Sequence, residues 1–159
     1  MGTRCGQLDA AVVLHLLREK AMDVDQVTEL LFRQSGLLGL SGLSSDMREL
    51  EASKLPAAQM AIDHFVEQVV EQIGRMAAAL RGVDAIVFTG GIGENATGLR
   101  ERILVQCAWL GVKMGEPQHV GAAQRLTSTA SRVAAWVIKT DEEGVIARHT
   151  AALLGQPRS

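Results

Sequence analysis

Apolar side chains recur with helical spacing over residues 56–80, which carry the clearest pattern in the chain. They return at steps of three and four residues, and polar side chains fall mostly on the other side, as on a helix with one apolar stripe. Pro56 suits the first turn of such a helix because an N–H would have no partner there. Gly82 is suited to end it. The pattern predicts a long amphipathic helix over 56–80.

Two shorter helices are predicted before it. Asp9 is suited to cap a helix over residues 10–20. Asp23 is followed three residues later by Gln26, which is the start of a capping box, and the helix after it should stop at 35–36.

Residues 35–46, SGLLGLSGLSSD, contain three glycines and four serines. This composition disfavours a regular helix, whereas the leucines disfavour disorder. We expect a packed loop with a short strand that ends at Asp46, where a short helix begins.

Strands and helices alternate in the second half of the chain. The expected elements are a strand over 85–89, a glycine turn over 90–93, a helix from Glu94 or Asn95 to Leu110, a strand over 133–138 and a final helix ending near Leu154. Residues 115–131 have no clear period. The alternation predicts an α/β domain with helices packed on a mixed sheet.

Composition narrows the class of protein. The length of 159 residues suits a single domain over 1–159, and 47% hydrophobic residues are enough for a core. A net charge of −2 gives no electrostatic argument for nucleic acid or an anionic membrane, and no apolar run approaches the ~20 residues of a membrane span. Two cysteines without metal-ligand spacing, and a start unlike a signal peptide, predict a cytoplasmic protein.

The segment FTGGIGEN carries the strongest chemical signal, because its glycines stand between a strand and a helix. Backbone N–H groups at a helix N-terminus favour an anion such as a phosphate. Three interpretations remain open on these residues alone: a tight turn without a ligand, a dinucleotide fingerprint, or an ATP-phosphate loop other than a Walker A. Gly91, Gly93 and Ala96 fit the dinucleotide spacing, with Glu116 further on. However, this motif usually opens its domain, whereas here some 80 mainly helical residues precede it.

Four segments together resemble the acetate and propionate kinase family: MGTRCGQLDAAVV, SGLLGLSGLSSDMRELE, FTGGIGEN and IKTDEEGVIAR. Their order and spacing also match, and the resemblance covers essentially the whole chain. It implies the RNase H-like fold of the actin, Hsp70 and sugar kinase superfamily. It also implies that this chain is the C-terminal, nucleotide-binding half of a two-domain enzyme.

The resemblance implies an activity as well. Enzymes of this family transfer the γ-phosphoryl group of ATP to acetate or propionate, use Mg²⁺ and form homodimers. The acceptor pocket belongs to the N-terminal domain, so the acceptor is not determined here and the isolated chain is expected to have little turnover. The alternatives are a nucleotide-binding or assembly module without catalysis, and an NAD-binding oxidoreductase domain.

The resemblance assigns site residues in the first half. Arg4 resembles the catalytic arginine that binds the transferring phosphoryl group, although Gln7 and Ala10 replace an aspartate and a proline of the family motif. The nucleoside pocket is implied to contain Asp46, Met47 and Arg48. Asp46 is also suited to be a helix N-cap.

It also assigns site residues in the second half. The phosphate and adenine wall is implied to contain Gly91, Ile92, Gly93 and Asn95. Arg100 either reaches a phosphate or lies on a solvated helix face, and Asn95 either contacts the ligand or caps its helix.

The Mg²⁺ site is implied to include Glu142. Thr140 and Glu143 have the spacing of a capping box, which predicts Thr140 as the N-cap and leaves Glu142 for the metal. Lys139 stands where the family often has a proline.

Overall fold

The computed structural model describes residues 2–155, except for the side chain of Glu142. The chain divides into two compact units, Met1–Gly82 and Val83–Ser159. The interpretation of residues 1–159 as a single nucleotide-binding domain stays a prediction. Within the described residues, no helix is both long and apolar enough to span a membrane.

The first unit is helical. Its helices are α1 (Ala10–Arg18), α2 (Val24–Arg33), α3 (Gly36–Ser41), α4 (Met47–Ala52) and α5 (Pro56–Ala79). The predicted caps are confirmed: Asp9 accepts a hydrogen bond from the backbone N–H of Ala11, and Asp23 forms a complete capping box with Gln26. Pro56 begins α5, as expected from its missing N–H.

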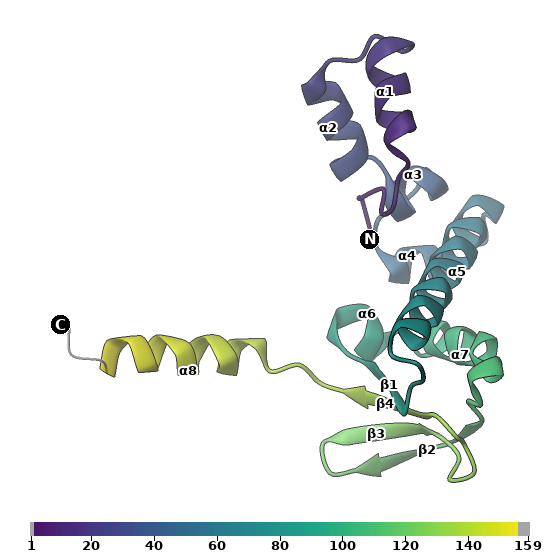
Figure 1. Ribbon diagram of the computed structural model, residues 1–159, viewed down its shortest axis with the longest axis vertical. Coiled ribbons are helices and arrows are strands. Elements are labelled where there is room, and N and C mark those ends of the chain that lie inside the picture. The colour runs from purple at the N-terminus through teal and green to yellow at the C-terminus, as the bar shows by residue number, and fades with distance from the viewer. Residues whose placement is uncertain (1, 156–159) are drawn as a thin grey trace. The chain divides into compact units, whose positions relative to one another are not determined.

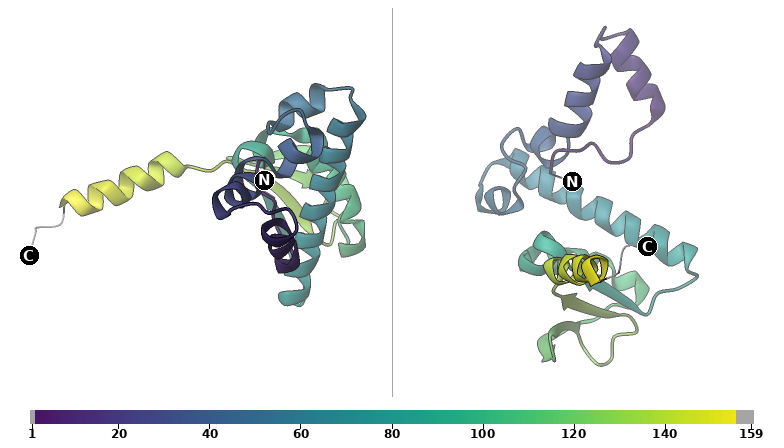
Figure 2. Two further views of the ribbon diagram at one scale, coloured as in Figure 1. Left: turned by 90° about the horizontal axis from the view of Figure 1, so that it is seen from above. Right: turned by 90° about the vertical axis from the view of Figure 1, so that its left-hand side faces the viewer.

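The core of this unit forms where α3 and α4 pack on α5, and α1 lies beside α2 (Figures 1 and 2). Leu50 from α4 and Val66 from α5 are completely buried, and Leu37 from α3 is 2% exposed. These apolar contacts fix the segment that carries Asp46, because Asp46 directly precedes α4.

The expectation of a loop with a strand over residues 35–46 is wrong, because Gly36–Ser41 forms α3. Burial of Leu37 outweighs the unfavourable helix propensity of glycine, which costs about 1 kcal/mol per residue. Gly42 ends the helix with a positive φ of 61°, a conformation that glycine adopts without strain.

The second unit contains a four-stranded sheet with the strand order β1-β4-β3-β2. Its elements are β1 (Ala85–Phe88), α6 (Gly90–Asn95), α7 (Thr97–Gln106), a 3₁₀ turn (Ala108–Leu110), β2 (Met114–Val120), β3 (Ala123–Thr127), β4 (Ala134–Ile138) and α8 (Glu142–Gly155). β1 pairs with β4 in parallel, whereas the other neighbours are antiparallel. The predicted mixed sheet with helices is confirmed.

Residues 115–131, which could not be placed from sequence, form most of the β2–β3 hairpin (Figure 1). Val120 pairs with Ala123, so Gly121 and Ala122 make a two-residue turn, and Gly121 has a φ of 62°. The pairing shifts register between Met114 and Gln118. This irregularity and the exposure of β2 at the sheet edge remove the alternation that predicts a strand.

The spacing of Leu99, Ile103, Cys107 and Leu110 predicts an inner stripe on the helix after the glycines. The first three are at most 3% exposed, whereas Leu110 is half-buried and lies in the 3₁₀ turn. Cys107 is completely buried, so it is an apolar core residue, and this burial raises the pKa of its thiol.

Candidate functional site

The glycine segment Gly90–Asn95 is itself the short helix α6, placed between β1 and α7. The sequence predicted a turn at these glycines and one helix from Glu94 or Asn95 to Leu110, so this prediction is wrong at both ends. Ala96, with φ −86° and ψ 80°, separates α6 from α7. The segment is helical although it contains three glycines, and its backbone is held by the side chains of Glu94, within the segment, and of Arg100 in α7.

The three glycines of this segment have different surroundings. Gly90 has a φ of 72°, which favours glycine at this position. A side chain at Gly93 would meet the backbone carbonyl carbon of Phe88 at 3.3 Å from its Cβ. A Cβ at Gly91 would meet nothing within 4 Å, and no positive φ restricts that residue. Gly91 is therefore the position of the three that the fold does not require to be glycine.

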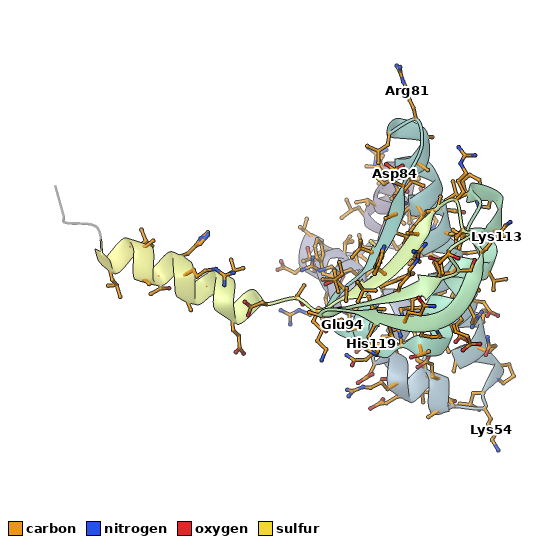
Figure 3. All side chains as sticks on the ribbon, turned by 90° about the horizontal axis from the view of Figure 1, so that it is seen from below. Lys54, Arg81, Asp84, Glu94, Lys113 and His119 are labelled. Carbon is orange, nitrogen blue, oxygen red and sulfur yellow. The ribbon has the colours of Figure 1, made fainter. Side chains whose placement is uncertain are left out.

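Glu94 holds the beginning of α6. Its Oε1 accepts hydrogen bonds from the N–H of Gly90 at 2.9 Å, from the N–H of Thr140 at 2.9 Å and from the hydroxyl of Thr140 at 3.0 Å. Glu94 lies beside the end of β4, where the chain leads toward α8 (Figure 3). These hydrogen bonds, first that from the Thr140 N–H, lower the pKa of the carboxyl group.

Sequence reasoning missed Glu94. The available signal was its position four residues after Gly90, from which a side chain can reach back to the start of a helix. That signal is visible only when the helix is placed at Gly90. The second partner, Thr140, is 46 residues away in sequence, and no local pattern connects the two.

Arg100 holds the other end of the glycine segment. Its Nη1 donates to the carbonyl oxygen of Gly93 at 2.9 Å, and its Nη2 donates to the hydroxyl of Thr97 at 3.0 Å. The side chain is 5% exposed, so the alternative of a solvated helix face is wrong. Burial of the guanidinium lowers its pKa.

Asn95 and Ile92, both predicted to contact the ligand, lie in α6. The Asn95 amide nitrogen donates to the carbonyl oxygen of Gly91 at 2.8 Å, so this side chain supports the last turn of the helix. Ile92 is half-buried. Both residues lie close to Gly91 in sequence, and their contact with a ligand stays a prediction.

Asp46, which is half-buried, and Arg48, which is exposed, form a pair in the first unit. Asp46 caps α4 by accepting a hydrogen bond from the backbone N–H of Arg48 at 2.9 Å, and the Arg48 guanidinium binds the same carboxylate through Nε at 3.1 Å and through Nη2. The Arg48 side chain and backbone together lower the pKa of Asp46 to about 2. Met47 is 4% exposed, so its side chain belongs to the core of this unit.

Arg4 also lies in the first unit. It is exposed, and its guanidinium carbon lies 5.9 Å from the centre of the Phe32 ring, a cation–π distance. It lines a cavity of about 430 Å³ together with Cys5, Gln7 and His64. Gln7, the replacement for the family's aspartate, accepts a hydrogen bond from Arg75 at 2.6 Å. Gln7 therefore binds Arg75 and not Arg4.

The predicted capping box before α8 is wrong. The helix begins at Glu142, and Asp141 is its cap, because Asp141 Oδ1 accepts a hydrogen bond from the Gly144 N–H at 3.1 Å. Thr140 is instead bound by Glu94. The predicted metal ligand, the side chain of Glu142, lies outside the described part of the chain. No cluster of three metal-ligating side chains occurs among the residues that the structure describes.

The strand order of the sheet argues against the dinucleotide interpretation. In a dinucleotide-binding fold, the strand after the glycine turn and its helix lies parallel beside the first strand. Here the next strand, β2, lies at the opposite edge of the sheet from β1 and pairs antiparallel with β3. Glu116, on β2, is therefore not in the position of the acidic residue of that fold.

Comparison with known proteins identifies the family. The model of the acetokinase family matches residues 1–148. An acetate kinase from Methylocella silvestris is 54% identical over 156 residues, which cover 98% of this chain and 39% of the relative.

Solved structures agree. The structure of an acetate kinase from Porphyromonas gingivalis matches 97% of this chain and 40% of its own, with a TM-score of 0.85 and 32% identity. That of a propionate kinase from Francisella tularensis matches 93% of this chain and 39% of its own, with a TM-score of 0.83 and 34% identity. The chain thus spans about two fifths of the length of these relatives, and the expected RNase H-like fold is confirmed. From the sequence match and the shared fold together, this chain belongs to the acetokinase family.

Proposed function

We propose that this chain supplies the nucleotide-binding part of a kinase that transfers the γ-phosphoryl group of ATP to a short carboxylate such as acetate or propionate. The names of the relatives, acetate kinase and propionate kinase, support this class of reaction. The observation that carries the proposal is the open backbone at Gly91, where a strand leads into a helix and no neighbouring atom fills the space of a side chain. A glycine that the fold does not require is accounted for by a ligand that must approach the backbone closely.

In this proposal the glycine segment receives the phosphate-bearing ligand. Gly91 allows the close approach, and Ile92 offers an apolar contact to the base. Gly93 and Asn95 keep the backbone of α6 in place, the first by its packing on Phe88 and the second by its hydrogen bond to Gly91.

The first unit contributes charged groups. The Asp46 carboxylate accepts hydrogen bonds from ribose hydroxyls, and Arg48 stacks on the base or pairs with a phosphate. The buried Met47 fixes the position of these two residues. Arg4 is the catalytic residue that binds the transferring phosphoryl group, since a guanidinium matches the charge on its equatorial oxygens.

Mg²⁺ is the metal ion that this proposal requires, with Glu142 as its protein ligand. Mg²⁺ usually keeps several waters and needs few protein carboxylates. Asp141 is engaged with the Gly144 N–H and with Arg148, at 3.4 Å, so it does not supply a second ligand in this arrangement.

The remaining features of the proposal follow from the family. They are ATP and ADP as ligands, acetate or propionate as acceptor, a homodimer in a full-length enzyme, and a cytoplasmic location. Since the chain spans about two fifths of its relatives, we expect the 159-residue chain to bind nucleotide but to show little turnover by itself.

The test compares two glycines on exposed helical positions. Gly91→Ala and Gly98→Ala both introduce a methyl group that meets nothing within 4 Å in the fold. Both should stabilise their helices slightly, because alanine is favoured over glycine by about 1 kcal/mol. We expect only Gly91→Ala to raise the Kd for MgATP, by roughly tenfold, in titration calorimetry.

Equal affinities for MgATP in the two variants would contradict the proposed contact at Gly91. Absence of MgATP binding by the unmodified chain would contradict the proposed function of the chain as a whole. Tighter binding of NADH than of MgATP would favour the oxidoreductase alternative.

A further inference from the structure

Glu94 connects two parts of the second unit that are distant in sequence. Its Oε1 receives three hydrogen bonds, one from the Gly90 N–H and two from the N–H and hydroxyl of Thr140. We call this set the Glu94 bridge. It joins the first residue of the glycine segment to the residue two positions before α8.

The bridge is built from a charged acceptor. The pKa of Glu94 is lowered by the Thr140 N–H, by its hydroxyl, by the Gly90 N–H and by the positive charge of Lys139. The carboxylate is therefore ionised at neutral pH, and its hydrogen bonds are charge-assisted, which makes them stronger than those between neutral groups.

The bridge also determines which part of the glycine segment remains open to a ligand. The N–H of Gly90 is occupied by Glu94, and the carbonyl oxygen of Gly93 is occupied by the buried Arg100. Gly91 lies between these two fixed points, and the space above it is open. The backbone is thus held one residue before Gly91 and two residues after it, by the side chains of Glu94 and Arg100.

We propose that Glu94 is a positioning residue, which orients the backbone at Gly91 for the phosphate-bearing ligand and fixes the turn at Thr140 against the glycine segment. This inference rests on the proposed function, because it concerns the same nucleotide site. Glu94 does not touch the ligand. It acts through Gly90 and Thr140, so its loss changes affinity by releasing two segments at once.

The experiment uses three variants of the 159-residue chain. Glu94→Ala removes the acceptor, and Glu94→Gln keeps a neutral oxygen of the same reach. Glu116→Gln is the matched control, because it neutralises an exposed glutamate on β2 of the same unit that accepts none of these hydrogen bonds. Amide hydrogen exchange by NMR follows the N–H groups of Gly90 and Thr140, and calorimetry measures the Kd for MgATP.

We expect Glu94→Ala to lose protection at both amides together and to raise the Kd for MgATP roughly tenfold, as loss of a supporting partner often does. Glu94→Gln should restore part of the protection and affinity, because its amide oxygen still accepts hydrogen bonds but without the charge. Glu116→Gln should resemble the unmodified chain. A merely structural role would also lose protection at both amides but would leave the Kd for MgATP unchanged, so the joint change of protection and affinity distinguishes a positioning role.

Two results would overturn the inference. Unchanged exchange at Gly90 and Thr140 in Glu94→Ala would show that the bridge does not hold these segments. Lost protection with an unchanged Kd would show that the bridge does not position the ligand site. Failure of the unmodified chain to bind MgATP would overturn the proposed function and, with it, the ligand-positioning part of this inference. The exchange data would still decide whether the bridge exists.

Discussion

The segments around Asp46 and around Gly91 are both predicted to bind the nucleotide, but they are held in different ways. Asp46 and Arg48 are two positions apart in sequence and bind each other, with Arg48 exposed and Asp46 half-buried. The glycine segment is held by Glu94, whose bridge reaches across 46 residues, and by Arg100, which is 5% exposed. The first arrangement is local and the second depends on the folded unit.

This difference determines how each segment responds to change. A local pair can form wherever its helix forms, so its loss removes a cap and little packing. A segment held by a buried arginine and a long-range carboxylate has its shape only while the sheet around it is intact. Substitutions should therefore cost most in the second unit and least at Asp46 and Arg48.

The largest effect is expected for Arg100→Ala. It removes the packing of a long buried side chain and leaves the Gly93 carbonyl without its donor, which together should lower the free energy of unfolding by roughly 2–4 kcal/mol. Both tryptophans of the chain, Trp109 and Trp136, lie in the second unit, so their fluorescence during urea unfolding measures this unit selectively.

Two further variants sharpen the result for Arg100. Arg100→Lys keeps the charge but loses the fork of two donors. Its free energy of unfolding should therefore lie between those of the alanine variant and the unmodified chain. Gln106→Ala, at an exposed position of the same helix, should have almost no effect. An Arg100→Ala chain as stable as the control would refute the view that this arginine holds the glycine segment.

A smaller loss is expected for Gly93→Val. The new side chain meets the backbone of Phe88, whose carbonyl carbon lies 3.3 Å from the position of the Cβ, and such crowding should cost roughly 1–3 kcal/mol. Gly98→Val is the control, since its side chain enters open space and costs only the small helix penalty of a branched residue. Equal losses of stability in the two variants would mean that packing against Phe88 is not the reason for a glycine at position 93.

The local parts of this fold could be predicted from sequence. Asp9, Asp23 and Pro56 each act within one turn of their own helix, so their patterns are complete in a few residues. The apolar stripe of α7 is equally local, and it was confirmed at Leu99 and Ile103. The mixed sheet followed from the alternation of such elements.

The remaining features depend on contacts that no short window contains. α3 forms because Leu37 is buried against α5, which outweighs its glycines. Thr140 does not cap α8 because it is hydrogen-bonded to Glu94, which is 46 residues away in sequence. No sequence pattern predicted the burial of Arg100, since its partners are a carbonyl and a hydroxyl and not an oppositely charged residue. The site residues themselves came from family resemblance, and their contacts with a ligand stay predictions.

The smallest effect concerns the pKa of Asp46, which is lowered from its ordinary 3.8 to about 2 by the Arg48 side chain and backbone. A carboxyl group with a lowered pKa in the folded state adds stability at pH values above its unfolded pKa, and this contribution is lost as the pH falls toward 2. Between pH 4 and 2, the cap of α4 should therefore weaken, whereas it should be constant near neutrality. NMR titration of the Asp46 carboxyl carbon measures this directly.

Arg48→Ala separates the two causes of this shift. It removes the guanidinium but keeps the backbone N–H that donates to Asp46 Oδ1, so the pKa should rise only part of the way to 3.8. Arg18→Ala, an exposed arginine on α1, should leave the titration unchanged. A full return to the ordinary value would mean that the cap itself contributes nothing, and no change would mean that the pair does not form in solution. Either result would remove the basis for treating Asp46 and Arg48 as one locally held element, in contrast to the glycine segment.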